Sequence, residues 1–250
     1  MQRTGTVQYS LAKILGIWAA AALPMAALAW IVAPWVADRL DGPLALPRAL
    51  LALLTVGLIW QFVLVMILVY RERGSPRWPV LKDALWLHAP RSPTTGRAGG
   101  RLWLVLIPAL LIFAAEGFIP HPFPPPPGYD FTAFVGSEAF AAFMSGNWGW
   151  YALIVALIVF NTILGEELLF RGVLLPRMQG AFGRFDWVAN GFLFAAYHLH
   201  MPWVIPATLL FDTFALSYPS RRYRSALIGI IVHSSQSVLT LVLMLTLVLQ

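Results

Sequence analysis

Two adjacent glutamates and an arginine lie inside an otherwise apolar stretch of the chain, NTILGEELLFRGVLL. Two further apolar stretches contain histidines, His198 in FAAYH and His233 in HSSQS. A carboxylate and an imidazole that face one another can deprotonate a water molecule. A second imidazole with a hydroxyl can then donate to the oxyanion that forms when this water attacks an amide. These residue types therefore suit a hydrolase that uses no covalent nucleophile.

The same residues leave a metal-dependent alternative open. Glu166, His198 and His233 could hold a divalent ion such as zinc, with one open position for water. The sequence does not separate this variant from the metal-free one. The chain has no cysteine, which excludes disulfides, thiolate zinc sites and cysteine nucleophiles.

The elements that must position these residues are membrane helices. Of the 250 residues, 59% are hydrophobic and 11% are charged, and the mean hydropathy is +0.74, which is typical of a polytopic membrane protein in a lipid bilayer. Because a span takes roughly 20 apolar residues, we expect an all-α membrane helix bundle with about seven transmembrane helices. The predicted spans cover residues 14–37, 49–70, 102–119, 148–170, 187–200, 203–218 and 225–249.

The distribution of charged residues predicts how the chain is oriented in the membrane and where it divides into two parts. The segment 71–101 has seven basic residues against Glu72 and Asp83, which predicts a cytoplasmic linker and a cytoplasmic N-terminus. Residues 1–147 are predicted to form N-terminal transmembrane helices with this linker, and residues 148–250 a catalytic helix core. The basic residues are spread over loops between spans, so the formal charge of +6 does not indicate nucleic-acid binding.

Helical spacing predicts different partners for the two glutamates. Glu167 and Arg171 are four residues apart and share a helix face, so we expect them to pair, either as a structural ion pair or as part of a site. Glu166 lies on a different stripe and remains free for a site.

Depth in the membrane predicts which groups can meet. If the fourth helix continues to about Met178, then Glu166, His198 and His233 lie roughly 18, 16 and 12 Å from the cytoplasmic ends of their helices. We therefore expect one cavity below the cytoplasmic face. His200 follows His198 by two positions and is expected to point away from it, toward the interface. Ionisable groups at such depth are expensive and indicate function.

Three motifs follow one another on successive helices. EELLFR (Glu166 to Arg171) fits a Glu-Glu-x-x-x-Arg motif, FAAYH (Phe194 to His198) a Phe-x-x-x-His motif, and HSSQS (His233 to Ser237) the start of a His-x-x-x-Asn/Asp motif. Over residues 148–238 the chain resembles the CPBP family of intramembrane proteases, which includes CAAX prenyl endopeptidases and bacteriocin-processing or abortive-infection proteins. EELLFRGVLLPRMQ is a specific signal, whereas Phe-x-x-x-His alone is weak.

The resemblance implies a role for each motif residue. Glu166 and His198 would activate the water, Glu167 would pair with Arg171 to support the site, and His233 would help to form the oxyanion hole.

Ser237 departs from the family pattern, because it stands where Asn or Asp is usual. A hydroxyl still donates one hydrogen bond but reaches less far than an amide, and losing an oxyanion donor costs about 100-fold or more in rate. The departure puts activity in question more than fold.

The resemblance implies a metallo- or glutamate-type endopeptidase acting on a membrane-associated peptide or protein that approaches from the cytoplasmic side. Fifteen Arg against two Lys, with abundant Ala, indicate a GC-rich bacterial genome and hence the bacterial inner membrane. Two other functions stay open. One is a family member without proteolysis that acts as a membrane scaffold or immunity protein, and the other is an ion-coupled transporter, which would show repeats with broken helices in both halves.

Overall fold

The computed structural model of the protein describes residues 7–250, and the regular elements in this range are all helices. This confirms the all-α fold. Four helices in the described range are long and apolar enough to cross a membrane: Leu11–Ala37, Ala45–Arg73, Trp148–Arg177 and Ala226–Val248. The protein is therefore a multi-pass membrane protein.

These four spans contain the following elements: α1 (Leu11–Ala27), a π-helical turn (Leu28–Val32) and α2 (Ala33–Ala37); α3 (Ala45–Arg73); α8 (Trp148–Val159), two π-helical segments (Phe160–Gly165 and Leu168–Leu174) and α9 (Leu175–Arg177); and α14 (Ala226–Val248). The third of them continues to Arg177, close to the predicted end at Met178. π-Helical turns are frequent at functional sites, and here they flank the two glutamates of EELLFR.

The other predicted spans are shorter helices: α5 (Leu106–Glu116), α11 (Asp186–Tyr197), and α12 (Ile205–Asp212), which passes through a π-helical turn (Thr213–Ser217) into α13 (Tyr218–Tyr223). The connections hold α4 (Trp78–Ala84), α6 (Phe131–Val135), α7 (Glu138–Met144) and α10 (Gln179–Phe182), with 3₁₀ turns at Gly100–Val105, Gly183–Phe185, His198–His200 and Pro202–Val204. Because length and composition support only four crossings in the described range, the predicted count of seven is not confirmed.

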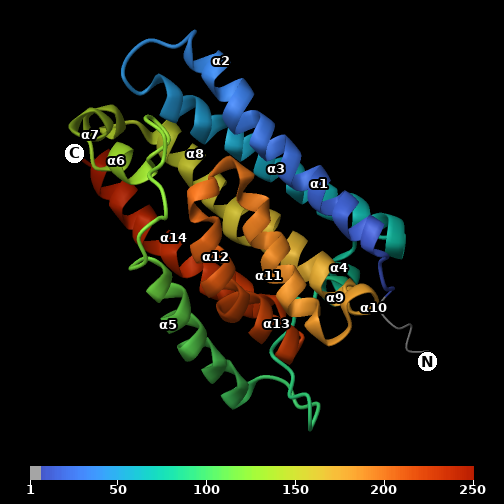
Figure 1. Cartoon of the computed structure of the whole chain (residues 1–250). Coiled ribbons are helices and arrows are strands. Elements are labelled where there is room, and N and C mark those ends of the chain that lie inside the picture. Colours follow the sequence, from blue (N-terminus) through green and yellow to red (C-terminus); the bar gives the residue numbers. More distant parts are fainter. Residues whose placement is uncertain (1–6) are drawn as a thin grey trace.

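The long helices lie side by side in one bundle (Figure 1). α1 and α2 run along α3 at one edge, whereas α5 lies at the other edge against α12 and α14. α14 ends beside α7, where the Gly146 N–H donates to the carbonyl of Val248 at 3.0 Å. At the opposite end, the Tyr9 N–H donates to the carbonyl of Arg177 at 2.9 Å. The described chain therefore begins and ends at opposite ends of the bundle.

Pro24 shows how the first helix is tied to the second. Proline has no N–H, so the carbonyl of Ala20, four residues earlier, loses its helical donor. The indole Nε1 of Trp60 in α3 donates to this carbonyl at 2.8 Å. An unsatisfied carbonyl costs several kcal/mol in hydrocarbon, so this bond stabilises the contact between α1 and α3.

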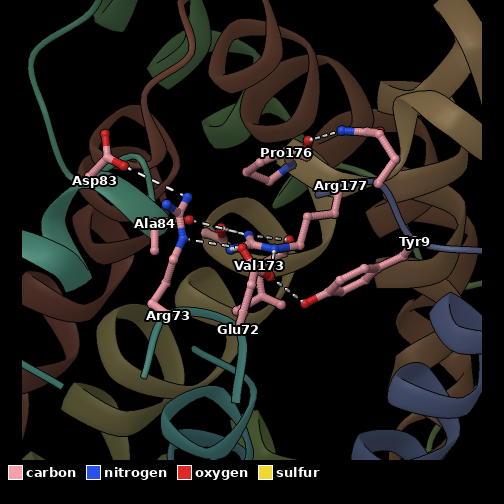
Figure 2. Close-up of polar contacts among 10 residues, drawn as sticks. Tyr9, Glu72, Arg73, Asp83, Ala84, Val173, Pro176 and Arg177 are labelled. Carbon is pink, nitrogen blue, oxygen red and sulfur yellow. Dashed lines mark hydrogen bonds and ion pairs between the residues drawn. The ribbon is translucent and has the colours of Figure 1, made fainter. Parts of the chain in front are cut away.

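Arg177 joins four segments at the end of the bundle opposite α7 (Figure 2). Its guanidinium is fully buried and binds the Glu72 carboxylate through Nε at 2.7 Å and Nη2 at 3.0 Å. Nη1 lies 3.2 Å from the carbonyl of Gly172 and 2.9 Å from that of Val173. The hydroxyl of Tyr9 donates to Glu72 at 3.0 Å. Residues from both predicted domains pack into the main apolar core, and the division after residue 147 stays a prediction.

Candidate active site

Glu167 lies at the centre of a buried charge cluster. Nη1 of Arg171 donates to Oε1 of Glu167 at 3.0 Å, and Nδ1 of His233 lies 3.0 Å from the same oxygen. The side chains of Glu167 and Arg171 are fully buried, and that of His233 is 12% exposed. The predicted pair of Glu167 with Arg171 is confirmed. The contact with His233 joins the Glu-Glu-x-x-x-Arg helix directly to α14.

The close approach of α14 to this cluster depends on Gly229. A Cβ at this position would overlap Oε2 of Glu167 and would lie 3.2 Å from Cγ of Arg171. Only a residue without a side chain leaves room for the carboxylate. Gly229 thus brings the backbone of α14, and with it His233, onto Glu167.

The guanidinium of Arg171 is held from two further helices. Its Nη2 lies 3.5 Å from Oγ of Ser217, which donates to Oδ1 of Asn190 at 3.0 Å. Nδ2 of Asn190 donates to the carbonyl of Phe170 at 2.9 Å. This chain of hydrogen bonds positions the arginine, and through it Glu167.

The ring of Phe194, from the Phe-x-x-x-His motif, packs between the two histidines. The Cζ of Arg171 lies 4.0 Å from its centroid, a cation–π arrangement. The rings of His198 and His233 meet it edge-on, with centroids 5.1 and 6.0 Å away. The three motifs therefore converge on one aromatic ring.

His198 begins a 3₁₀ turn immediately after α11 ends at Tyr197. Its Nδ1 lies 3.0 Å from the carbonyl of Phe194. Because a carbonyl only accepts hydrogen bonds, Nδ1 carries the proton, and Nε2 of the neutral ring is an acceptor.

The expectation that His200 points away from His198 is wrong. His200 is buried, and its ring stacks on that of His198 with centroids 5.5 Å apart and planes 25° apart. The reason is that the α-helix ends at Tyr197, so the spacing of an α-helix no longer applies to this pair.

Glu166 is buried on a different side of its helix from Glu167 and has different partners. Tyr197 is one of its neighbours, and Nε2 of Gln61 donates to the Tyr197 hydroxyl at 2.6 Å. Among the described residues, Oε2 of Glu166 has no hydrogen-bond partner. This oxygen is an acceptor that a water molecule can use.

The described residues hold no group of three or more His, Asp or Glu side chains that could bind a metal ion. Glu166, His198 and His233 therefore do not fit the three-ligand zinc set that the sequence allows. Both histidines already use Nδ1, on the Phe194 carbonyl and on Glu167. Zinc dependence stays a prediction.

A cavity of about 410 Å³ reaches the site. Of the predicted site residues, His233 and Ser237 line it, together with His200. Tyr129 and Phe131 form part of its wall at the end of the bundle where α6 lies, opposite the segment 71–101. The cavity thus differs from the one expected below the basic face, because neither Glu166 nor His198 lines it.

The fold is that of a multi-pass membrane protein, and the cluster joins a buried glutamate, an arginine and a histidine from two of its spans. Residues 147–239 match the family described as type II CAAX prenyl endopeptidase Rce1-like. The match includes all three motifs and confirms the resemblance to the CPBP family over these residues, and it supports an intramembrane endopeptidase. The comparisons with curated proteins and with solved structures found no match.

Two site residues were not singled out from the sequence. Tyr197 lies inside the FAAYH motif next to His198, and Gln61 is the one amide in the predicted second span. A polar residue at membrane depth is itself a signal of function, so Gln61 was open to prediction. Its contact with Tyr197, 136 positions away in the chain, was not.

Proposed function

We propose that the protein is an intramembrane endopeptidase that hydrolyses a peptide bond of a membrane-associated substrate with a water activated by glutamate and histidine. The observation that carries this proposal is the contrast between the two adjacent glutamates. Glu167 is neutralised by Arg171 and bound to His233. Glu166 keeps a buried oxygen without a partner in the described chain, so its carboxylate can accept a proton.

The first step is attack by water. Oε2 of Glu166 accepts a proton from the water, and Nε2 of His198 accepts a hydrogen bond from it, because its Nδ1 carries the proton. The water oxygen forms a bond to the carbonyl carbon of the substrate. The π electrons of the carbonyl move to its oxygen, which becomes the oxyanion.

The second step stabilises the oxyanion and completes the cleavage. Since Nδ1 of His233 donates to Glu167, only Nε2 can face the substrate, and it donates when the ring is an imidazolium, a state that the Glu167 carboxylate stabilises. The hydroxyl of Ser237 is a second donor in the same cavity. The oxyanion then collapses, the C–N bond breaks, and the proton held by Glu166 passes to the leaving nitrogen.

The cavity supports a peptide substrate. Leu51, Leu54 and Ile158 line it beside His233 and Gln236, so apolar side chains and backbone amides both find partners there. We propose a bacterial peptide or membrane protein as substrate, in the inner membrane, with a cytoplasmic N-terminus. Processing of the bacteriocin type fits this proposal better than cleavage of a prenylated CAAX protein.

One observation favours a second candidate, a membrane scaffold or immunity protein without proteolysis. Ser237 stands where the family pattern has an amide or a carboxylate, its side chain is shorter, and losing an oxyanion donor altogether costs about 100-fold or more in rate.

Cleavage of a membrane-peptide library by the detergent-solubilised protein separates the two candidates. The wild type should cleave, and Glu166→Gln and His198→Ala should not. Glu138→Gln, at an exposed position of α7, serves as a matched control and should cleave normally. Activity retained in a chelator supports the metal-free route. A folded wild type that cleaves nothing favours the scaffold.

A further inference from the structure

A groove of about 580 Å³ runs along one face of α3 toward the end of this helix. Two rows of side chains line it, and within each row the residues are four apart, so that they share one stripe of the helix. The rows are Phe62, Met66 and Tyr70, and Val63, Ile67 and Arg71. Pro76, which follows the end of α3, also lines the groove. None of these residues takes part in the proposed cleavage.

The groove is apolar over the part of α3 that can cross the membrane. Phe62 is half-buried, and its ring meets that of Phe160 edge-on, with centroids 5.8 Å apart. Val63 and Ile67 are 40% and 37% exposed. The eight positions from Val63 to Arg71 correspond to roughly 12 Å of helix, and the hydrocarbon of one leaflet is about 15 Å thick. The groove therefore has the length of an acyl chain in one leaflet.

Exposed aromatic side chains mark the end of the groove as the level of the lipid headgroups. Tyr70 is 56% exposed where the apolar part of α3 ends, and Trp78 is 64% exposed at the start of α4. Tyrosine and tryptophan are enriched at this level of a membrane. Arg71 is exposed and follows Tyr70 directly, so its guanidinium is within reach of a headgroup phosphate.

Arg71 also differs from the charged residues next to it in having no partner. Glu72 accepts from Arg177 at 2.7 Å. Arg73 lies 3.3 Å from Glu72 and 3.7 Å from Asp83 (Figure 2). Within residues 7–250 the side chain of Arg71 makes no ion pair or hydrogen bond. Its positive charge is therefore available to an anion at the end of the apolar groove.

We propose that this groove binds an anionic phospholipid, whose acyl chain lies along the two rows and whose headgroup phosphate pairs with Arg71. The apolar length favours a lipid over a free phosphate. The unpaired guanidinium favours a headgroup with a net negative charge over a zwitterionic one. The site is separate from the cavity that reaches His233, and it does not depend on the proposed function.

The test compares the binding of phosphatidylglycerol and phosphatidylcholine to the detergent-solubilised protein by native mass spectrometry. The wild type should bind phosphatidylglycerol more tightly. Arg71→Gln should weaken phosphatidylglycerol by about 5-fold, since one arginine near an anionic lipid surface contributes about 1 kcal/mol, and should leave phosphatidylcholine nearly unchanged. Arg101→Gln is the matched control, because Arg101 is exposed in the same basic segment but does not line the groove.

Ile67→Trp tests where the acyl chain lies. The larger side chain fills the groove and should weaken both lipids alike. Val56→Trp is its control, at a position of α3 that is 56% exposed and outside the groove, and should change neither. An excess of inorganic phosphate should not displace phosphatidylglycerol. Because the four substituted positions are exposed, each variant should keep the melting temperature of the wild type, which confirms that it is folded.

Several results would overturn the proposal. Equal binding of the two lipids by the wild type would remove the preference for an anionic headgroup. Equal losses in Arg71→Gln and Arg101→Gln would assign the binding to the general positive charge of the segment. Unchanged binding in Ile67→Trp would place the acyl chain outside the groove, and displacement by inorganic phosphate would make Arg71 a site for a free anion.

Discussion

His233 donates from Nδ1 to Oε1 of Glu167 at 3.0 Å, although the two residues are 66 positions apart in the chain. The same carboxylate oxygen accepts from Arg171. The ion pair on the Glu-Glu-x-x-x-Arg helix and the proposed oxyanion donor on α14 are therefore one unit. A change in the ion pair should act on catalysis through His233.

Glu167→Gln should destabilise the protein and abolish cleavage. The substitution keeps the shape of the side chain but leaves the buried Arg171 without a negative partner, which costs about 3 to 5 kcal/mol in free energy of unfolding. It also removes the carboxylate that stabilises His233 as an imidazolium. Thermal unfolding in detergent and the cleavage assay measure the two effects.

The double variant Glu167→Gln, Arg171→Met separates the effect on stability from the effect on cleavage. Since it removes both charges, it should recover much of the lost stability, while cleavage stays lost. Normal cleavage by the double variant would show that the cluster only supports the fold.

Gly229→Ala should lower activity and stability together. The added Cβ would overlap Oε2 of Glu167, so α14 must move away and take His233 with it. Gly16→Ala is the matched control, since a Cβ at Gly16 has no neighbour within 4 Å. Because alanine has the higher helix propensity by about 1 kcal/mol, the control should be as stable as the wild type or more so. Equal activity in both variants would contradict the role of Gly229.

The sequence predicted how the two glutamates differ, because the four-residue spacing of Glu167 and Arg171 brings them together whatever the rest of the fold does. It also predicted the all-α membrane fold, which follows from composition. The contact of His233 with Glu167 was not predictable in this way, since the approach of two helices depends on packing at positions such as Gly229.

The environment of His198 shows a second feature that could not be predicted from the sequence. Helical spacing placed His200 on the opposite side, but α11 ends at Tyr197 and the two histidine rings stack. Helix ends are the least predictable part of a sequence pattern, and here one of them lies inside the site. The hydrogen bond from Gln61 to Tyr197 was not predictable for another reason. It joins two helices that lie far apart in the sequence, and no sequence motif indicates that these helices are neighbours.

Arg177→Met should destabilise the protein by up to about 3 kcal/mol, because the Glu72 carboxylate loses its bidentate partner and keeps only Arg73 at 3.3 Å and the Tyr9 hydroxyl. The carbonyl of Gly172 also loses a donor. Arg184→Met, at an exposed position a few residues later, is the control and should change stability little. Thermal unfolding in detergent distinguishes the two, and a similar melting temperature for both variants would contradict the structural role of Arg177.

Stability should fall at alkaline pH in a way that depends on Tyr9. Burial raises the pKa of Tyr9 to about 12, whereas an unfolded tyrosine has a pKa of about 10. The unfolded chain therefore releases this proton first, so the contribution of Tyr9 is complete below about pH 10 and is lost as the pH rises toward about 12. Unfolding of the wild type and of Tyr9→Phe should show a steeper alkaline decline for the wild type. Parallel declines would assign the effect to other groups.

Ser237→Asn should raise the rate of cleavage. Ser237 lies one turn after His233 on α14, and both side chains line the same cavity. An asparagine amide at this position matches the family pattern and reaches further into the cavity than a hydroxyl, so it should donate a better hydrogen bond to the oxyanion. Since a single oxyanion donor is worth about 100-fold in rate, kcat should rise by up to that factor with KM nearly unchanged. Ser235→Asn is the control, because the hydroxyl of Ser235 donates to the carbonyl of Val232. If Ser237→Asn leaves kcat unchanged in an active enzyme, then Ser237 is not an oxyanion donor, and His233 must supply that stabilisation alone.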